Sequence, residues 1–284
     1  MLWQRVVTAV ALLALLLPAL FADSPDPFTG LVLVLIAAGG WEWGRLNGCG
    51  QPASITLALI CLVMCTGAWW AGWPGVAAPL LWLIAGAAWV FAGAGLLRNG
   101  VSGWPRISLP IRLAGGVASL FLAWLAVAQA RAIGINFLLS LLVLVWVADI
   151  FAYFAGRAFG LRFTRSKLAP SISPGKSWEG VWGGMGGVVV LGFAWVAADT
   201  HWQASVPSLY SRLASVSPWL LVLAVVFLGA MSVVGDLVES LIKRSAGVKD
   251  SSRLLPGHGG VLDRVDALLP ALPVSMMIFS LLAR

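Results

Sequence analysis

Charged residues are scarce in this 284-residue chain. Only 10% of the residues are Asp, Glu, Lys or Arg, whereas 60% are hydrophobic, and the mean hydropathy is +0.95. About a quarter of the residues of a typical soluble domain are charged, so the composition excludes a soluble globular protein. Cysteine is scarce too. Cys49, Cys61 and Cys65 have no metal-ligand spacing and form no evident pair, which excludes a disulfide framework and a cysteine metal centre.

Long apolar runs fill most of the sequence. A membrane-spanning helix needs about 20 apolar residues, and these runs predict an all-α polytopic integral membrane protein with about nine transmembrane helices. The second run is the weakest because Glu42 and Arg45 lie near its end. The first run resembles a cleaved signal peptide, but its removal would spoil the charge alternation described next. The predicted spans are residues 5–22, 28–44, 54–71, 76–97, 109–130, 133–155, 180–198, 218–236 and 264–283.

Lysine and arginine gather on one side of these spans. If the N-terminus is cytoplasmic, fifteen of them lie in inside segments and only Arg131, Arg212 and Arg284 lie in outside segments. The positive-inside rule therefore predicts a cytoplasmic N-terminus and an external C-terminus in the inner membrane. The loops 156–179 and 237–263 then face the cytoplasm, where nucleotides are found. The net charge of +7 fits contact with anionic lipid headgroups, and we expect no nucleic-acid partner.

Polar chemistry is concentrated in the second half of the chain. Residues 1–131 contain five apolar spans joined by short loops, and few polar side chains in this region are expected to be buried. These residues are expected to form an N-terminal transmembrane scaffold, and residues 132–284 a catalytic region that carries both polar loops. The glycines in residues 180–198 are best explained by close helix packing.

The stretch from residue 236 to residue 266 carries the strongest candidate site. Asp236 and Lys243 fall on one face of a helix that ends at the cytoplasm, and Asp263 and Asp266 share a face of the next helix. If the connecting loop folds back, Asp236 and Asp263 could reach one Mg²⁺, which usually takes one or two carboxylates with phosphate oxygens and water. The alternative role of Asp263 is a helix N-cap, which needs no partner acid.

The loop between these helices is basic and rich in glycine. Gly259 and Gly260 precede a helix start, where backbone N–H groups and the helix dipole favour an anion. His258 is a ligand donor, an acid or a polar loop residue, and the sequence leaves these roles open. The bases around the loop are candidates to clamp phosphates: Lys243, Arg244, Lys249 and Arg264.

Two further regions carry candidates. Asp149 interrupts an apolar run, and because an acid inside a span costs about 2.5–3.5 kcal/mol we expect a polar role for it, with Arg157 as the alternative structural partner. The loop before residue 180 contains prolines that forbid a regular helix, and its lysines and hydroxyls are phosphate and ribose ligands by type. These candidates are Lys167, Ser173, Lys176 and Ser177.

Together these motifs resemble the signature of the phosphatidate cytidylyltransferases, or CDP-diacylglycerol synthases. Four segments carry the similarity: Ser240-Leu-Ile-Lys-Arg, Lys249-Asp, Pro256-Gly-His-Gly-Gly and Asp263-Arg-Val-Asp. A match of several motifs at fixed spacing is far more specific than a single glycine motif. Lys167-Leu-Ala-Pro, Ser173-Pro-Gly-Lys-Ser-Trp-Glu-Gly and Gly235-Asp-Leu are also similar. The resemblance covers residues 145–270 well, whereas residues 1–130 match only in being helical and apolar.

The resemblance implies a membrane enzyme that joins CTP and phosphatidic acid, giving CDP-diacylglycerol and pyrophosphate for phospholipid synthesis. By the family's spacing Asp236 and Asp263 would hold Mg²⁺, with K⁺ as a second cation. We also expect Lys243 and His258 to take part in catalysis. CTP, phosphatidic acid and membrane lipids are the expected partners, and a homodimer is the candidate assembly. One departure lies after Asp149, where the family commonly has Ser or Thr and then Gly, and this chain has Ile and Phe. A role that the family assigns to the Ser or Thr hydroxyl at this position therefore cannot apply to this chain.

The residues by themselves are also consistent with two other functions. Acids inside spans and glycine-rich helices also suit an ion-coupled transporter, although inverted repeats are absent and the polar residues gather in cytoplasmic loops. A CTP-dependent enzyme acting on an isoprenoid alcohol or an ether lipid is the second alternative. Mg²⁺-dependent release of pyrophosphate from CTP would separate an enzyme from a transporter, and the acceptor lipid would separate the two enzymes.

Overall fold

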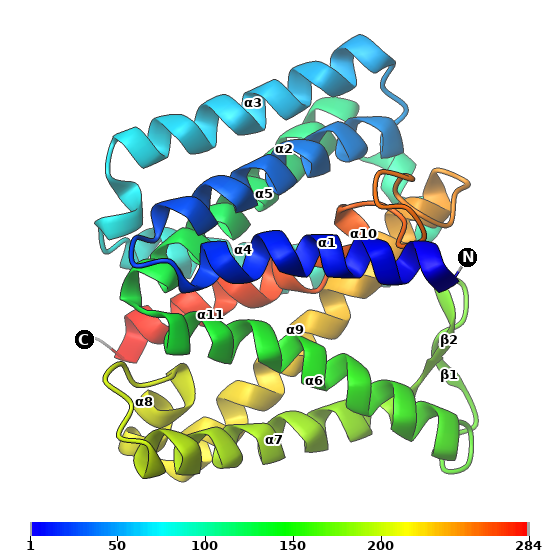
Figure 1. Cartoon of the computed structure of the whole chain (residues 1–284). Helices are drawn as coiled ribbons and strands as arrows, with labels where there is room; N and C mark the ends of the chain where they lie inside the picture. The colour runs from blue at the N-terminus through cyan, green and yellow to red at the C-terminus, as the bar shows by residue number, and fades with distance from the viewer. Residues whose placement is uncertain (1, 283–284) are drawn as a thin grey trace.

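Helices make up most of the structure, a computed structural model that describes residues 2–282. They run between the two ends of one bundle (Figure 1). Apolar side chains dominate them, and a helix satisfies all of its backbone hydrogen bonds internally, as a membrane requires. The long helices are α1 (Leu2–Phe21), α2 (Asp26–Leu46), α3 (Gln51–Trp70), α4 (Pro79–Asn99), α5 (Leu109–Ile133), α6 (Ile135–Phe159), α7 (Trp178–His201), α9 (Pro218–Ser245) and α11 (Leu268–Leu282).

Within the described residues, eight helical segments are long and apolar enough to cross a membrane. The prediction of an all-α polytopic membrane protein is thereby confirmed. The second predicted span is helix α2, but it is not among the eight, because Asp26, Glu42 and Arg45 lower its hydropathy. It still packs against α3 and α5. Residue 283, where the last predicted span ends, and Arg284 lie outside the described residues.

Both polar loops lie at the same end of the bundle (Figure 1). The start of α1 lies there too, since the Thr8 hydroxyl donates a hydrogen bond to the Pro256 carbonyl oxygen (2.9 Å). The loop after α9 returns through the short helix α10 (Leu262–Val265) to α11. The C-terminal end of α11 lies at the other end, together with α8 (Leu209–Val216) (Figure 1). The start of α1 and the end of α11 therefore lie at opposite ends of the bundle, while the predicted placement of the chain ends relative to a membrane stays a prediction.

Two details of the polar loops differ from the sequence prediction. The first loop contains an antiparallel hairpin of β1 (Lys167–Ala169) and β2 (Ser173–Ser177), so it is not simply irregular. The second loop is shorter than the predicted 237–263, because α9 continues beyond the predicted end of the span to Ser245, in agreement with the helical face predicted for Asp236 and Lys243. This extension makes residues 236–243 part of one rigid helix.

The glycines of α7 allow it to lie directly against α6. A Cβ atom at Gly184 would lie 2.8 Å from the carbonyl oxygen of Ala148, so any larger residue would push the two helices apart. Similar close approaches to α6 at Gly180, Gly183 and Gly187 confirm the packing role predicted for these glycines, whereas Gly186 has open space around it. This packing also holds α6, which carries Asp149, beside the helix that follows the hairpin.

Candidate active site

Lys243 lies at the centre of a buried ionic cluster at the loop-bearing end of the bundle. Its Nζ is 2.6 Å from Asp263 Oδ1 and also pairs with Glu239, one turn earlier in α9. The Lys243 side chain is 11% exposed, and those of both partners are 5% exposed. A buried charge is strongly unfavourable without such partners, so the two carboxylates hold the ammonium group in place.

Asp236 joins the hairpin to the same helix. Its carboxylate pairs with Lys176 of β2 and accepts a hydrogen bond from the Ser240 hydroxyl (3.3 Å). Asp236, Ser240 and Lys243 therefore share one face of α9, as the helical spacing predicted. Lys176 and Lys243 bring cationic groups to this face from two different elements.

Carboxylates outnumber lysines in this cluster. Asp149 of α6 lies in the electrostatic field of Asp236 and Lys176. Asp266 is in the field of Asp236, Lys176 and Lys243. With Glu239 and Asp263 included, five carboxyl groups face two ammonium groups. Carboxyl groups crowded in a partly buried site repel one another when they are ionised, so a bound cation would stabilise their charged forms.

Asp263 also orders the glycine-rich loop. Its Oδ2 accepts hydrogen bonds from the backbone N–H groups of Ser251 (2.9 Å) and Gly260 (2.8 Å), and from the Ser251 hydroxyl (2.9 Å). Asp263 lies inside α10, whose N-cap position is Val261. The N-cap alternative is therefore wrong, and this carboxylate connects α9 to the loop instead.

Glu42 of α2 is a site residue that the sequence prediction missed. It is fully buried. Its Oε1 accepts from the Val261 N–H (2.9 Å) and the Ser252 hydroxyl, and its Oε2 from the Leu262 N–H (2.7 Å) and the Ser251 hydroxyl (3.2 Å). The N-terminal half thus supplies a buried charge to the loop, contrary to the expectation of little buried polarity. The sequence feature that could have indicated this role is a single acidic residue inside an apolar run.

Gly260 allows the loop to approach these acids. A Cβ atom there would collide with the Ser251 hydroxyl and with Glu42, so only glycine fits between them. Gly259 lies at the turn before it, and its carbonyl oxygen accepts a hydrogen bond from the Leu255 N–H (2.9 Å). The two glycines therefore shape the loop around Asp263 and Glu42.

The predicted hairpin residues have structural contacts of their own. The Ser177 hydroxyl caps α7 by accepting a hydrogen bond from the Gly180 N–H (3.2 Å). Lys167 Nζ donates to the Pro174 carbonyl oxygen, and Ser173 begins β2 opposite Ala169. Of the four, the structure brings Lys176 into contact with the cluster acids.

The remaining predicted bases lie around the loop. Arg264 donates two hydrogen bonds to the His258 carbonyl oxygen (3.1 and 2.7 Å). Arg244 Nε donates to the Ile172 carbonyl oxygen (3.4 Å), which ties α9 to the hairpin turn. Lys249 is exposed. His258 Nδ1 is buried, and the described residues give it no hydrogen-bond partner.

The chain is similar to known proteins along its whole length. The profile of the cytidylyltransferase family matches residues 3–282. The chain belongs to this family. The phosphatidate cytidylyltransferase of Pseudomonas aeruginosa is 37% identical over 96% of this chain and 95% of the relative. That of Haemophilus influenzae is 36% identical over 96% of both chains. That of Thermotoga maritima is 43% identical over 50% of this chain and 49% of the relative.

Membership of the cytidylyltransferase family extends to the N-terminal helices. The sequence resemblance was evident only over residues 145–270, whereas the family match begins at residue 3 and includes Glu42. The N-terminal helices are therefore part of the family's structure. Their contact with the loop through Glu42 gives a physical reason for this.

A cation site in this cytidylyltransferase must be consistent with the pairs already described. In the part of the chain that the structure describes, no three His, Cys, Asp or Glu side chains are grouped as ligands of one metal ion. Asp263 and Asp236 are each paired with a lysine. The donors nevertheless fit Mg²⁺ that arrives with phosphate, because such an ion needs only one or two protein carboxylates and carboxyl groups outnumber ammonium groups in the cluster.

Proposed function

We propose that this protein transfers a cytidylyl group from CTP to phosphatidic acid, giving CDP-diacylglycerol and pyrophosphate. The observation that carries the proposal is the partly buried cluster of Asp236, Lys243 and Asp263 at the loop-bearing end of an apolar bundle. The relatives similar to the whole chain are named phosphatidate cytidylyltransferases. In the reaction, a phosphate oxygen of phosphatidic acid bonds to the α-phosphorus of CTP, and the α–β bridging bond breaks to release pyrophosphate.

The main task of the protein is to bring two anions together. Both substrates carry phosphate, so their charges must be neutralised and their reacting atoms aligned. Lys176 and Lys243 reach the cluster from the hairpin and from α9, and incoming phosphates would compete with Asp236 and Asp263 for these ammonium groups. Mg²⁺ held by Asp236 and Asp263, with K⁺ as a second cation, would supply further neutralisation of nucleotide phosphates.

The position of the cluster suits one water-soluble and one lipid substrate. It lies at the end of the bundle, beside helices that keep apolar surface toward lipid, so a diacyl tail can remain in the bilayer while the phosphate reaches the cluster. We place this end at the cytoplasmic face of the inner membrane, where CTP is available. The bias of lysine and arginine toward the same loops supports this orientation.

The proposal is tested with the purified full chain in detergent, Mg²⁺ and CTP labelled at either the α- or the γ-phosphate. The acceptor panel is phosphatidic acid, diacylglycerol, an isoprenoid alcohol and an ether-linked lipid phosphate. We expect the α-label in the lipid product and the γ-label in pyrophosphate, with phosphatidic acid as acceptor and no turnover with the alcohols. A γ-label in the lipid would indicate a kinase. Absence of pyrophosphate release with every acceptor would favour the transporter alternative.

A further inference from the structure

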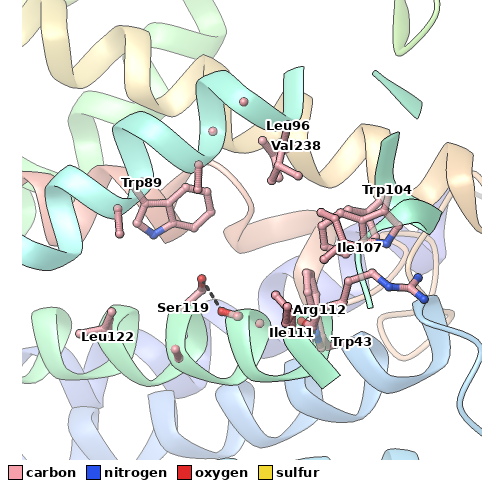
Figure 2. Close-up of a pocket in the computed structure, with 18 of the residues that line it drawn as sticks. Trp43, Trp89, Leu96, Trp104, Ile107, Ile111, Arg112, Ser119, Leu122 and Val238 are labelled. Carbon is pink, nitrogen blue, oxygen red and sulfur yellow. Dashed lines mark hydrogen bonds between the residues drawn. The ribbon is translucent and has the colours of Figure 1, made fainter. Parts of the chain in front are cut away.

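A separate cavity of about 460 Å³ opens between α4 and α5 (Figure 2). Most of its lining is apolar. Figure 2 shows Trp89 and Leu122 toward one end, and Trp104 and Arg112 toward the other. We call this cavity the α4–α5 groove. Its dimensions and lining suit an acyl chain rather than a nucleotide.

Helix α9 separates the groove from the ionic cluster. Val238 and Ile242 line the groove, whereas Asp236 and Lys243 carry the cluster. Two residues along a helix turn through about 200°, so Val238 lies on the side of α9 opposite to Asp236. A molecule in the groove would therefore lie behind the catalytic face and outside the reaction proposed above.

One end of the groove holds two buried N–H donors that lack acceptors. Trp104 is 5% exposed, and its indole Nε1–H has no hydrogen-bond partner among the described residues. Arg112 Nε is also buried and unpaired within that part of the chain, and the guanidinium carbon lies 5.9 Å from the centre of the Trp104 ring. Buried donors are nearly always paired in native proteins, so two adjacent unpaired donors point to an oxygen-bearing ligand.

The same end of the groove is cationic. Arg98 lies in the last turn of α4, Arg106 ends the short helix η2 (Val101–Arg106), and Arg112 lies in the first turn of α5. The sequence contains no acidic residue between Glu42 and Asp149, so no neighbouring carboxylate along these elements neutralises the three arginines. Cations at the edge of an apolar surface attract anionic lipid headgroups.

We propose that the α4–α5 groove binds one anionic phospholipid. Its acyl chain lies along Trp89 and Leu96, and its phosphate or ester oxygens accept hydrogen bonds from Arg112 and Trp104. Phosphatidic acid and other anionic phospholipids share this chemistry. The bound lipid packs against the back of α9 and does not react.

The test is native mass spectrometry of the purified full chain, titrated with phosphatidylglycerol or phosphatidylcholine of identical acyl chains and without CTP. We expect one phosphatidylglycerol per chain, bound about tenfold more tightly than phosphatidylcholine, as suits charge-assisted hydrogen bonds. Arg112→Gln should abolish this preference. Arg162→Gln removes the same charge from an exposed position in the first polar loop, outside the groove lining, so it should keep the preference.

A second pair of variants tests the groove itself, independently of any charge. Ala92→Phe places a ring in the lining and should abolish the bound phosphatidylglycerol. Ala94→Phe, also exposed on α4 but outside the lining, should leave it unchanged. Retained binding in Ala92→Phe, or equal losses in the two arginine variants, would overturn the proposal. Binding of phosphatidic acid with no binding of phosphatidylglycerol would overturn it too, and would make the groove a substrate site. Since CTP is absent, these results do not depend on the proposed reaction.

Discussion

Replacement of Glu42 by glutamine should slow catalysis from a position that touches no reacting atom. Each carboxylate oxygen of Glu42 accepts one backbone N–H, from Val261 or from Leu262. Glutamine is nearly isosteric but offers one oxygen and one NH₂ group, so one of the backbone donors would face another donor. The start of α10, and with it Asp263, would lose one of its attachments to the N-terminal helices.

The size of the effect follows from these contacts. A hydrogen bond to a charged acceptor contributes about 1.5–3 kcal/mol, and a buried donor left unpaired costs about 1–3 kcal/mol. Since the Ser251 and Ser252 hydroxyls can rotate to new acceptors, we expect a net loss of about 2–4 kcal/mol in local stability. A rate that depends on the position of Asp263 should then fall about tenfold or more, because about 1.4 kcal/mol corresponds to a factor of ten.

The assay is incorporation of α-labelled CTP into lipid, per amount of folded protein, together with thermal unfolding in detergent. Asp199→Asn is the matched control. The Asp199 carboxylate accepts hydrogen bonds from the Ser208 N–H (2.9 Å) and hydroxyl (2.6 Å) and from the Asn136 amide (2.8 Å), far along α7 from the loop-bearing end. It should lower thermal stability and leave the turnover of folded protein intact. A Glu42→Gln protein with normal turnover and a normal midpoint would refute the positioning role.

Three further outcomes are expected. Gly260→Ala should destabilise the loop by about 1–3 kcal/mol through overpacking and lower turnover, whereas Gly186→Ala, with open space around it, should change neither unfolding nor turnover. A topology reporter fused after Arg253 should read cytoplasmic and one near Gln203 external, and the reverse reading would exclude a cytoplasmic nucleotide site. Removal of divalent cations with EDTA should stop pyrophosphate release, and added Mg²⁺ should restore it. Full turnover in EDTA would exclude a Mg²⁺ requirement.

Local properties of the sequence were sufficient for most of the fold. A transmembrane helix needs only a continuous apolar run, so hydropathy located the long helices, and helical spacing placed Asp236 and Lys243 on one face. Glu42 could not be assigned this way, because Ser251, with which it forms a hydrogen bond, lies 209 residues later in the chain. The hairpin escaped prediction for a similar reason, since its strands are short, β2 contains Pro174, and the hairpin is held to α9 by the pair between Lys176 and Asp236. The role of Glu42 and the hairpin both depend on contacts between segments that are distant in the sequence, which residue type does not indicate.

We propose that Asp236, in the last third of α9, and Asp263, in α10, support cytidylyl transfer to phosphatidic acid. The most direct measurement is incorporation of α-labelled CTP into lipid by Asp236→Asn, Asp263→Asn and the double variant, each shown to be folded in detergent. Each single variant should lose on the order of a thousandfold in rate, and the double variant should be little worse, because the two acids serve one site. Asp266→Asn should be milder. A near-normal rate in Asp263→Asn, with easier unfolding, would show that Asp263 is a structural residue and that the reaction occurs elsewhere.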